Sequence, residues 1–97
     1  MPKYLFAYRA PKSYAAGDPE AMERWTRYFE ELGNAVDQIG NPVFTASTVG
    51  TCDEGTRLGG FSFISADDLE SAVALAKGAP SVGNGGGVEV GEITELM

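Results

Sequence analysis

The chain of 97 residues is long enough for one hydrophobic core, and its charge already excludes two classes of partner. Seven Lys and Arg against 14 Asp and Glu give a net charge of −7, whereas nucleic acids and anionic membranes are bound by cationic surfaces, so we predict neither partner. The lack of His removes the commonest metal ligand and the usual general base, and we predict no metal and no cofactor. Cys52 is the single cysteine and no basic and apolar leader begins the chain, which indicates a cytoplasmic location.

Residues 3–9 are predicted to form a strand that is apolar on both faces. Tyr4, Phe6 and Tyr8 would project to one side, and Leu5 and Ala7 to the other. A strand with one wet face usually alternates apolar and polar residues, so this strand is expected in the middle of a sheet that is covered on both sides. The chain's own helices would supply one cover, and a second copy of the protein is the candidate for the other.

A helix is predicted to begin at Asp18, whose side chain can accept from free N–H groups, with Pro19 at the first helical position. An apolar stripe then follows with helical spacing, made of Met22, Trp25, Phe29, Leu32 and Val36. The helix could end at Gly33, or continue through Val36 and stop near Gly40. We favour the longer helix.

Two strands are predicted next, at residues 43–49 and 58–64, joined as a hairpin by the polar, turn-rich residues 50–56. Phe61 and Phe63 would share one face of the later strand, and Gly59 and Gly60 indicate a bulge.

A second helix is predicted from a Ser65 N-cap to Gly78, with a buried stripe of Leu69, Ala72, Val73 and Ala76. The glycine-rich residues 81–87 are expected to be too flexible to hold a shape by themselves. Residues 88–96 then give a fourth strand whose mixed charges suit a sheet edge.

The order β-α-β-β-α-β predicts an α+β, ferredoxin-like fold, in which a four-stranded antiparallel sheet carries two helices on one face. The first and third strands would lie in the centre of the sheet. Because two helices cover only one face, we expect a homodimer formed through the other face, as in a dimeric α+β barrel.

Short motifs distributed along nearly the whole chain also resemble the YCII-related, or DGPF-domain, family. These are 4–8, Trp25, 28–29, 32–33, 40–42, 58–61, 68–72, 76–80 and 88–90, and residues 1–97 would form a single YCII-like domain. The resemblance implies a dimeric ferredoxin-like protein. One branch of the family resembles dehydrochlorinases of chlorinated aromatics, to which a catalytic His and a nearby Asp are assigned. By spacing these fall near Met22 and Glu31, and residues 52–55 stand in place of the DGPF tetrapeptide.

Two groups of residues are candidates for ligand binding. Tyr8, Trp25 and Tyr28 could line an aromatic pocket between the first helix and the sheet, in which burial would shift the pKa of Glu31; alternatively the aromatics are ordinary core and Glu31 is solvated. Arg9 with three hydroxyl residues, Thr45, Ser47 and Thr48, could hold a carboxylate or carbonyl group, or could simply be surface.

No paired catalytic set is present, so the sequence favours a dimeric module that is non-catalytic or binds a small aromatic or carbonyl ligand between the first helix and the sheet. The alternative is a small-molecule enzyme that moves a proton on an aromatic or carbonyl compound, as in dehydrochlorinases and isomerases. Cys52 has acidic neighbours that make it a poor nucleophile.

Overall fold

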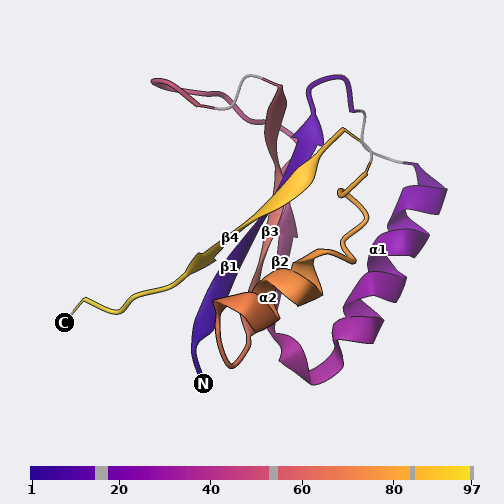
Figure 1. Ribbon diagram of the computed structural model, residues 1–97. Coiled ribbons are helices and arrows are strands. Elements are labelled where there is room, and N and C mark those ends of the chain that lie inside the picture. The colour runs from indigo at the N-terminus through magenta and orange to yellow at the C-terminus, as the bar shows by residue number, and fades with distance from the viewer. Residues whose placement is uncertain (15–17, 53–54, 84, 97) are drawn as a thin grey trace.

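The fold is a four-stranded antiparallel sheet with two helices on one side (Figure 1). The computed structural model describes residues 1–14, 18–52, 55–83 and 85–96. Its elements are β1 (Lys3–Pro11), α1 (Pro19–Leu32), the 3₁₀ turn η1 (Gly33–Ala35), β2 (Val36–Pro42), β3 (Thr56–Ser65), α2 (Leu69–Ala76) and β4 (Gly87–Glu92). The strand order β2-β3-β1-β4 confirms the predicted ferredoxin-like arrangement with the first and third strands in the centre.

β1 is the strand around which the core is built, as its sequence predicts. Tyr4, Phe6 and Tyr8 are buried on the helix side, and Ile64 of β3 lies opposite Tyr4 in the same layer. The register between β1 and β3 shifts at Gly59, so the predicted bulge is present.

α1 begins as predicted but ends earlier than we expected. The Asp18 side chain accepts a hydrogen bond from the Glu20 N–H at 3.1 Å, and Pro19 occupies the first turn. Gly33 then adopts a positive φ of 54° and donates its N–H to the Phe29 carbonyl, which ends the helix. The longer helix through Val36 is therefore wrong.

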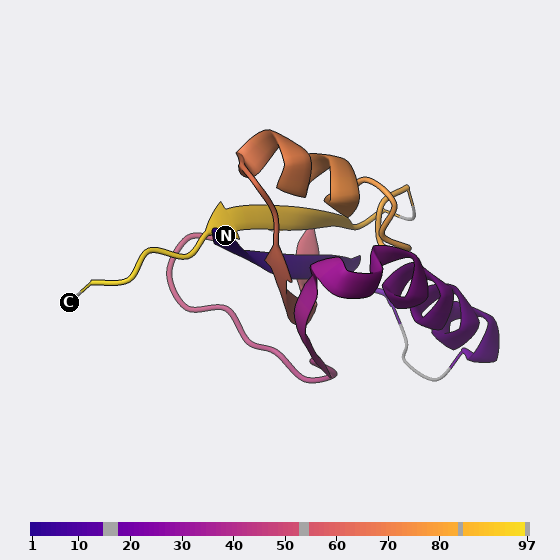
Figure 2. The ribbon, with the colours of Figure 1, turned by 90° about the horizontal axis from the view of Figure 1, so that it is seen from below.

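The buried stripe of α1 is rotated from the predicted one. Ala21, Tyr28 and Leu32 are buried, Trp25 is half-buried and Met22 is 66% exposed. The two views agree that the C-terminal end of α1 lies near the sheet while its N-terminal end extends away from it (Figures 1 and 2). This divergence gives a physical reason for the exposure of Met22.

The second strand lies seven residues earlier than we predicted. Residues 36–42 form β2, whereas residues 43–49 are not part of a strand. Residues 43–49 project to the side away from the helices (Figure 1). Gly40 permits this path, because it has a φ of 75° and a side chain there would collide with the Phe61 carbonyl oxygen. The hairpin partners are thus β2 and β3, and Asp53 and Glu54 of the predicted turn lie outside the described residues.

α2 and β4 are both shorter than predicted. Asp68, and not Ser65, caps α2 by accepting from the Ser71 N–H at 2.8 Å, while Ser65 still belongs to β3. Ala72 and Ala76 are buried as expected, but Leu69 is 51% exposed because the helix turns its small residues toward the sheet. α2 lies beside β4 (Figure 2), and β4 ends at Glu92 instead of continuing to residue 96.

The face of the sheet opposite the helices, here called the open face, carries apolar residues of the two central strands. Leu5 is 36% exposed, and the Phe61 and Phe63 rings lie 5.9 Å apart with partial exposure. In the described part of the chain, no helix is long and apolar enough to cross a membrane.

Candidate functional site

An aromatic cluster forms where α1 meets β1. The Tyr8 ring of β1 contacts Trp25 edge to face, with 4.6 Å between ring centroids. Phe29 stacks on Trp25 at 5.8 Å and lies 5.5 Å from Tyr28, so the three α1 rings extend the cluster along the helix. Edge-to-face and offset pairs at these separations are favourable beyond the area they bury. The cluster combines a buried sheet residue with a half-buried Trp25 at its outer side.

The Tyr8 hydroxyl is the unusual atom of this cluster. Tyr8 is only 4% exposed, and its hydroxyl forms no hydrogen bond with the described residues. The Ser62 hydroxyl lies nearby and donates to the Ile39 carbonyl at 2.6 Å, but its position relative to Tyr8 does not meet hydrogen-bond geometry. Burial raises the pKa of Tyr8 to about 12, and the Ser62 hydroxyl offsets only part of that effect. Tyr8 is therefore a neutral phenol with a proton available for donation.

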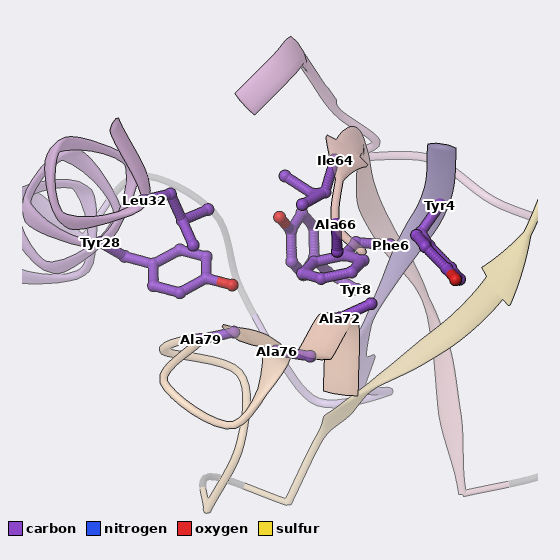
Figure 3. Packing of buried hydrophobic residues seen from close by; sticks show 10 residues of the cluster. All are labelled: Tyr4, Phe6, Tyr8, Tyr28, Leu32, Ile64, Ala66, Ala72, Ala76 and Ala79. Carbon is purple, nitrogen blue, oxygen red and sulfur yellow. The ribbon is translucent and has the colours of Figure 1, made fainter. Parts of the chain in front are cut away.

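Tyr28 provides the contrast within the same cluster. Its hydroxyl donates to the Leu75 carbonyl of α2 at 3.0 Å, which ties the two helices together. Burial, followed by the neighbouring Tyr8, raises the pKa of Tyr28. Figure 3 shows the Tyr28 ring reaching from α1 toward the alanines Ala76 and Ala79. One buried phenol thus has its partner in the chain, and the other does not.

Arg9 lies on the open face, apart from the cluster. Its Nε donates to Thr56 Oγ1 at 3.1 Å and its Nη2 to the Thr56 carbonyl at 3.3 Å. The hydroxyl partner of Arg9 is thus Thr56, and not the predicted Thr45, Ser47 or Thr48. This contact follows from the register of β1 and β3, which the sequence does not give. Arg9 pairs with Leu58, and Thr56, two residues before Leu58, points to the same face of the sheet.

The six predicted ligand residues therefore do not converge on one place. Tyr8, Trp25 and Tyr28 lie together, whereas Glu31 and Ser47 are both exposed. Two hollows are prominent on the surface, one on the solvent side of α1 and one beside Arg9, and neither is lined by Tyr8 or Trp25. Among the described residues, no three Cys, Asp or Glu side chains are grouped as a metal site would need.

Comparison with known proteins gives a match in fold. No protein-family model matches the chain, and no curated protein matches its sequence. A solved structure of 5-chloro-2-hydroxyhydroquinone dehydrochlorinase (TftG) from Burkholderia phenoliruptrix AC1100, in complex with 2,5-dihydroxybenzoquinone, is similar with a TM-score of 0.58 and 20% sequence identity. The match covers 97% of this chain and 95% of that chain. The two proteins share a fold along nearly their whole lengths, and it is the fold that the YCII-related resemblance implied.

Proposed function

We propose that the protein is a YCII-related, small-molecule-binding protein of one domain (residues 1–97), and that it binds a planar ring compound bearing a carbonyl or hydroxyl oxygen. The observation that carries this proposal is the buried Tyr8 hydroxyl, which has no hydrogen-bond partner in the described chain. An unsatisfied buried hydroxyl costs about 1–3 kcal/mol, and a ligand oxygen placed beside it recovers that free energy.

The surroundings of Tyr8 favour a ring as the ligand. Aromatic side chains stack on planar ligands, and the half-buried Trp25 offers ring surface at the outer side of the cluster. Neither hollow is lined by Tyr8 or Trp25, and the rings of these two residues are packed together, so this proposal requires α1 to move before a ligand reaches the Tyr8 hydroxyl. A raised pKa keeps the Tyr8 proton in place, so Tyr8 donates to a ligand oxygen and does not act as a base.

A second candidate function is catalysis of proton transfer on a similar ring. The fold neighbour is a dehydrochlorinase whose structure holds a dihydroxybenzoquinone, and this favours ring chemistry for the fold. In this chain a neutral Tyr8 could polarise a ring carbonyl by hydrogen bonding, as the acid partner of such a reaction. The base would have to be a carboxylate such as Glu31, because the chain has no His, and Glu31 is exposed. Binding without chemistry is therefore our first proposal.

We further propose that the protein is a cytoplasmic homodimer joined through the open face. The apolar residues Leu5, Phe61 and Phe63 support this assembly, since they lie on the central strands and no helix or strand of the described residues covers them. Phe44 and Val49, which are 64% and 91% exposed, add apolar surface in the segment that projects to the same side of the sheet (Figure 1). The exposed, unpaired Cys52 suits a reducing compartment.

The binding proposal is tested through Trp25, the only tryptophan in the chain. Quenching of Trp25 fluorescence is measured with 2,5-dihydroxybenzoquinone, phenol and benzoate, with toluene as a ring that lacks oxygen, and calorimetry checks each result. We expect saturable quenching by at least one oxygenated ring and about tenfold weaker binding in Tyr8→Phe, which corresponds to the loss of one hydrogen bond of about 1.4 kcal/mol. Tyr28→Phe is the matched control and should keep its affinity.

The same two variants give opposite stability changes if Tyr8 is unsatisfied in the free protein. Tyr8→Phe should raise the free energy of urea unfolding by about 1 kcal/mol, and Tyr28→Phe should lower it by about 1 kcal/mol because the Leu75 carbonyl loses its donor. Equal affinity of wild type and Tyr8→Phe for every ring, or no saturable quenching by any of them, would contradict the binding proposal.

A further inference from the structure

A hollow of about 540 Å³ lies at one end of the open face, where the end of β1 meets the beginning of β4. Its lining includes Arg9 of β1, Thr56 of β3, Gly87 and Glu89 of β4, and Cys52. This volume is within the range of small-molecule sites in proteins. Neighbouring residues of a strand point to opposite faces, so Arg9 and the hollow are separated by the sheet from Tyr8 and the aromatic cluster.

The Arg9 guanidinium is held so that one of its edges remains free. Nε and Nη2, which form the side edge, both donate to Thr56. Nη1 makes no hydrogen bond with the described residues, and a guanidinium nitrogen of this kind carries two N–H groups. The end edge, formed by Nη1 and the second N–H of Nη2, is therefore available to the two oxygens of a carboxylate. Thr56 fixes the plane of the fork in advance.

Gly87 keeps the space beside Arg9 empty. It pairs with Arg9 in the register of β1 and β4, its φ is not positive, and a Cβ built there would meet nothing within 4 Å. Neither backbone conformation nor crowding requires glycine at this position. In the glycine-rich segment beside it, Ser81 Oγ donates to the Gly87 carbonyl at 2.9 Å and Val82 forms a β-bridge with Gly86. Asn84 lies outside the described residues.

Glu89 brings the opposite charge to the same hollow. It lies two residues beyond Gly87 on β4, so both point to the open face. Lys3 with Asp37 is the ion pair found among the described residues, so Arg9 and Glu89 are not within ion-pair distance of each other. A free guanidinium edge and an exposed carboxylate thus face one hollow without neutralising each other.

We propose that this hollow binds a small zwitterion of the α-amino-acid class, with its carboxylate on the Arg9 fork and its ammonium group on Glu89. The charge of the chain decides between this class and simple anions, because a net charge of −7 repels a dianion and leaves a neutral zwitterion unaffected. The Glu89 carboxylate also repels a ligand that carries a carboxylate without an ammonium group. This site is independent of the ring-binding site proposed at Tyr8.

Cys52 supplies a direct readout, since it is the only thiol of the chain, is exposed and lines the hollow. The rate of its alkylation by iodoacetamide is followed by mass spectrometry with L-alanine, L-glutamine or L-phenylalanine present. Propionate and ethylamine are the matched halves that carry only one of the two charged groups. At about 10 mM, which nearly saturates a site of millimolar affinity, we expect at least one amino acid to slow alkylation about fivefold, and propionate and ethylamine to have little effect.

Variants separate this site from a general effect of amino acids on the protein. Gly87→Val fills the hollow and should abolish the protection, whereas Gly91→Val, another uncrowded glycine of β4, should retain it. Arg9→Lys keeps the charge but loses the fork, and should weaken protection. Glu89→Gln, an exposed substitution that leaves the fold intact, should remove the preference for alanine over propionate. The proposal is overturned if no amino acid protects Cys52, if propionate protects as well as alanine in the wild type, or if Gly87→Val keeps full protection.

Discussion

Tyr8 and Tyr28 show how a single hydrogen bond separates a structural residue from a candidate functional one. Both rings are buried in the same cluster, and both pKa values are raised by burial. Tyr28 has its acceptor in the Leu75 carbonyl, so it stabilises the contact between the helices. Tyr8 has no acceptor in the described chain, so its burial destabilises the free protein, and a ligand oxygen that accepts from it would restore the lost hydrogen bond.

Alkaline unfolding should report the burial of Tyr8. The Tyr8 pKa is about 12 in the folded protein and about 10 in the unfolded chain, so the unfolded state loses this proton first as pH rises. The contribution of Tyr8 to the free energy of unfolding is therefore complete below pH of about 10 and is lost as pH approaches about 12. Between pH of about 9 and about 11.5, wild type should lose about 2 kcal/mol more unfolding free energy than Tyr8→Phe in urea titrations. Parallel losses in the two proteins would show that Tyr8 is solvated.

The residues of the candidate sites were only partly predictable from the sequence. Tyr8 and Trp25 could be grouped, because the sequence predicted a strand and a helical stripe that both had to bury apolar surface, and Tyr28 lies close to that stripe. The free Tyr8 hydroxyl could not be predicted, since it depends on which acceptor atoms lie within hydrogen-bond geometry of that hydroxyl. This is set by side-chain geometry across neighbouring strands, which composition and periodicity do not contain.

At the scale of elements, β1 and the start of α1 followed from local rules, while β2 and the start of α2 did not. A run that is apolar on both faces identified β1, and Asp18 with Pro19 identified the start of α1. Residues 43–49 have the higher β-propensity, yet residues 36–42 form the strand. Propensity for strands depends on what a residue packs against, and here the early end of α1 at Gly33 places residues 36–42 beside β3.

The end of α1 can be tested at Gly33, because its φ of 54° is costly for any other residue. Gly33→Ala should lower the free energy of unfolding by about 1–3 kcal/mol, although a Cβ there would meet nothing within 4 Å. Gly78→Ala is the matched control, since Gly78 also follows a helix, its φ is not positive and a Cβ would only touch Tyr28 at 3.6 Å. It should leave stability unchanged or raise it by about 0.5 kcal/mol. Equal urea midpoints for the two variants would contradict this explanation of the helix end.

At the scale of the whole molecule, the two faces of the sheet differ in what covers them. The helix side is closed by α1 and α2 around the buried residues of β1 and β3. The open face carries apolar residues in its centre, and the separate charges of Arg9 and Glu89 line the hollow at one side of it. A second copy packed over Leu5, Phe61 and Phe63 would lie close to Glu89, because Phe61 and Glu89 both pair with Ala7. The two proposals for this face are compatible when the second copy leaves the Arg9 end of the hollow uncovered.

Dimer formation through the open face predicts that a single charge at its centre separates the protomers. Wild type should sediment at micromolar concentration as a particle of about twice the 10.2 kDa chain mass. Leu5→Glu places a carboxylate at a residue that is already 36% exposed, so we expect it to fold and to sediment as a monomer, because a buried unpaired charge disfavours the dimer by several kcal/mol. Met22→Glu, on the exposed side of α1, is the control and should remain a dimer. A wild-type protein that sediments as a folded monomer would contradict the assembly, and a dimeric Leu5→Glu would place its interface elsewhere.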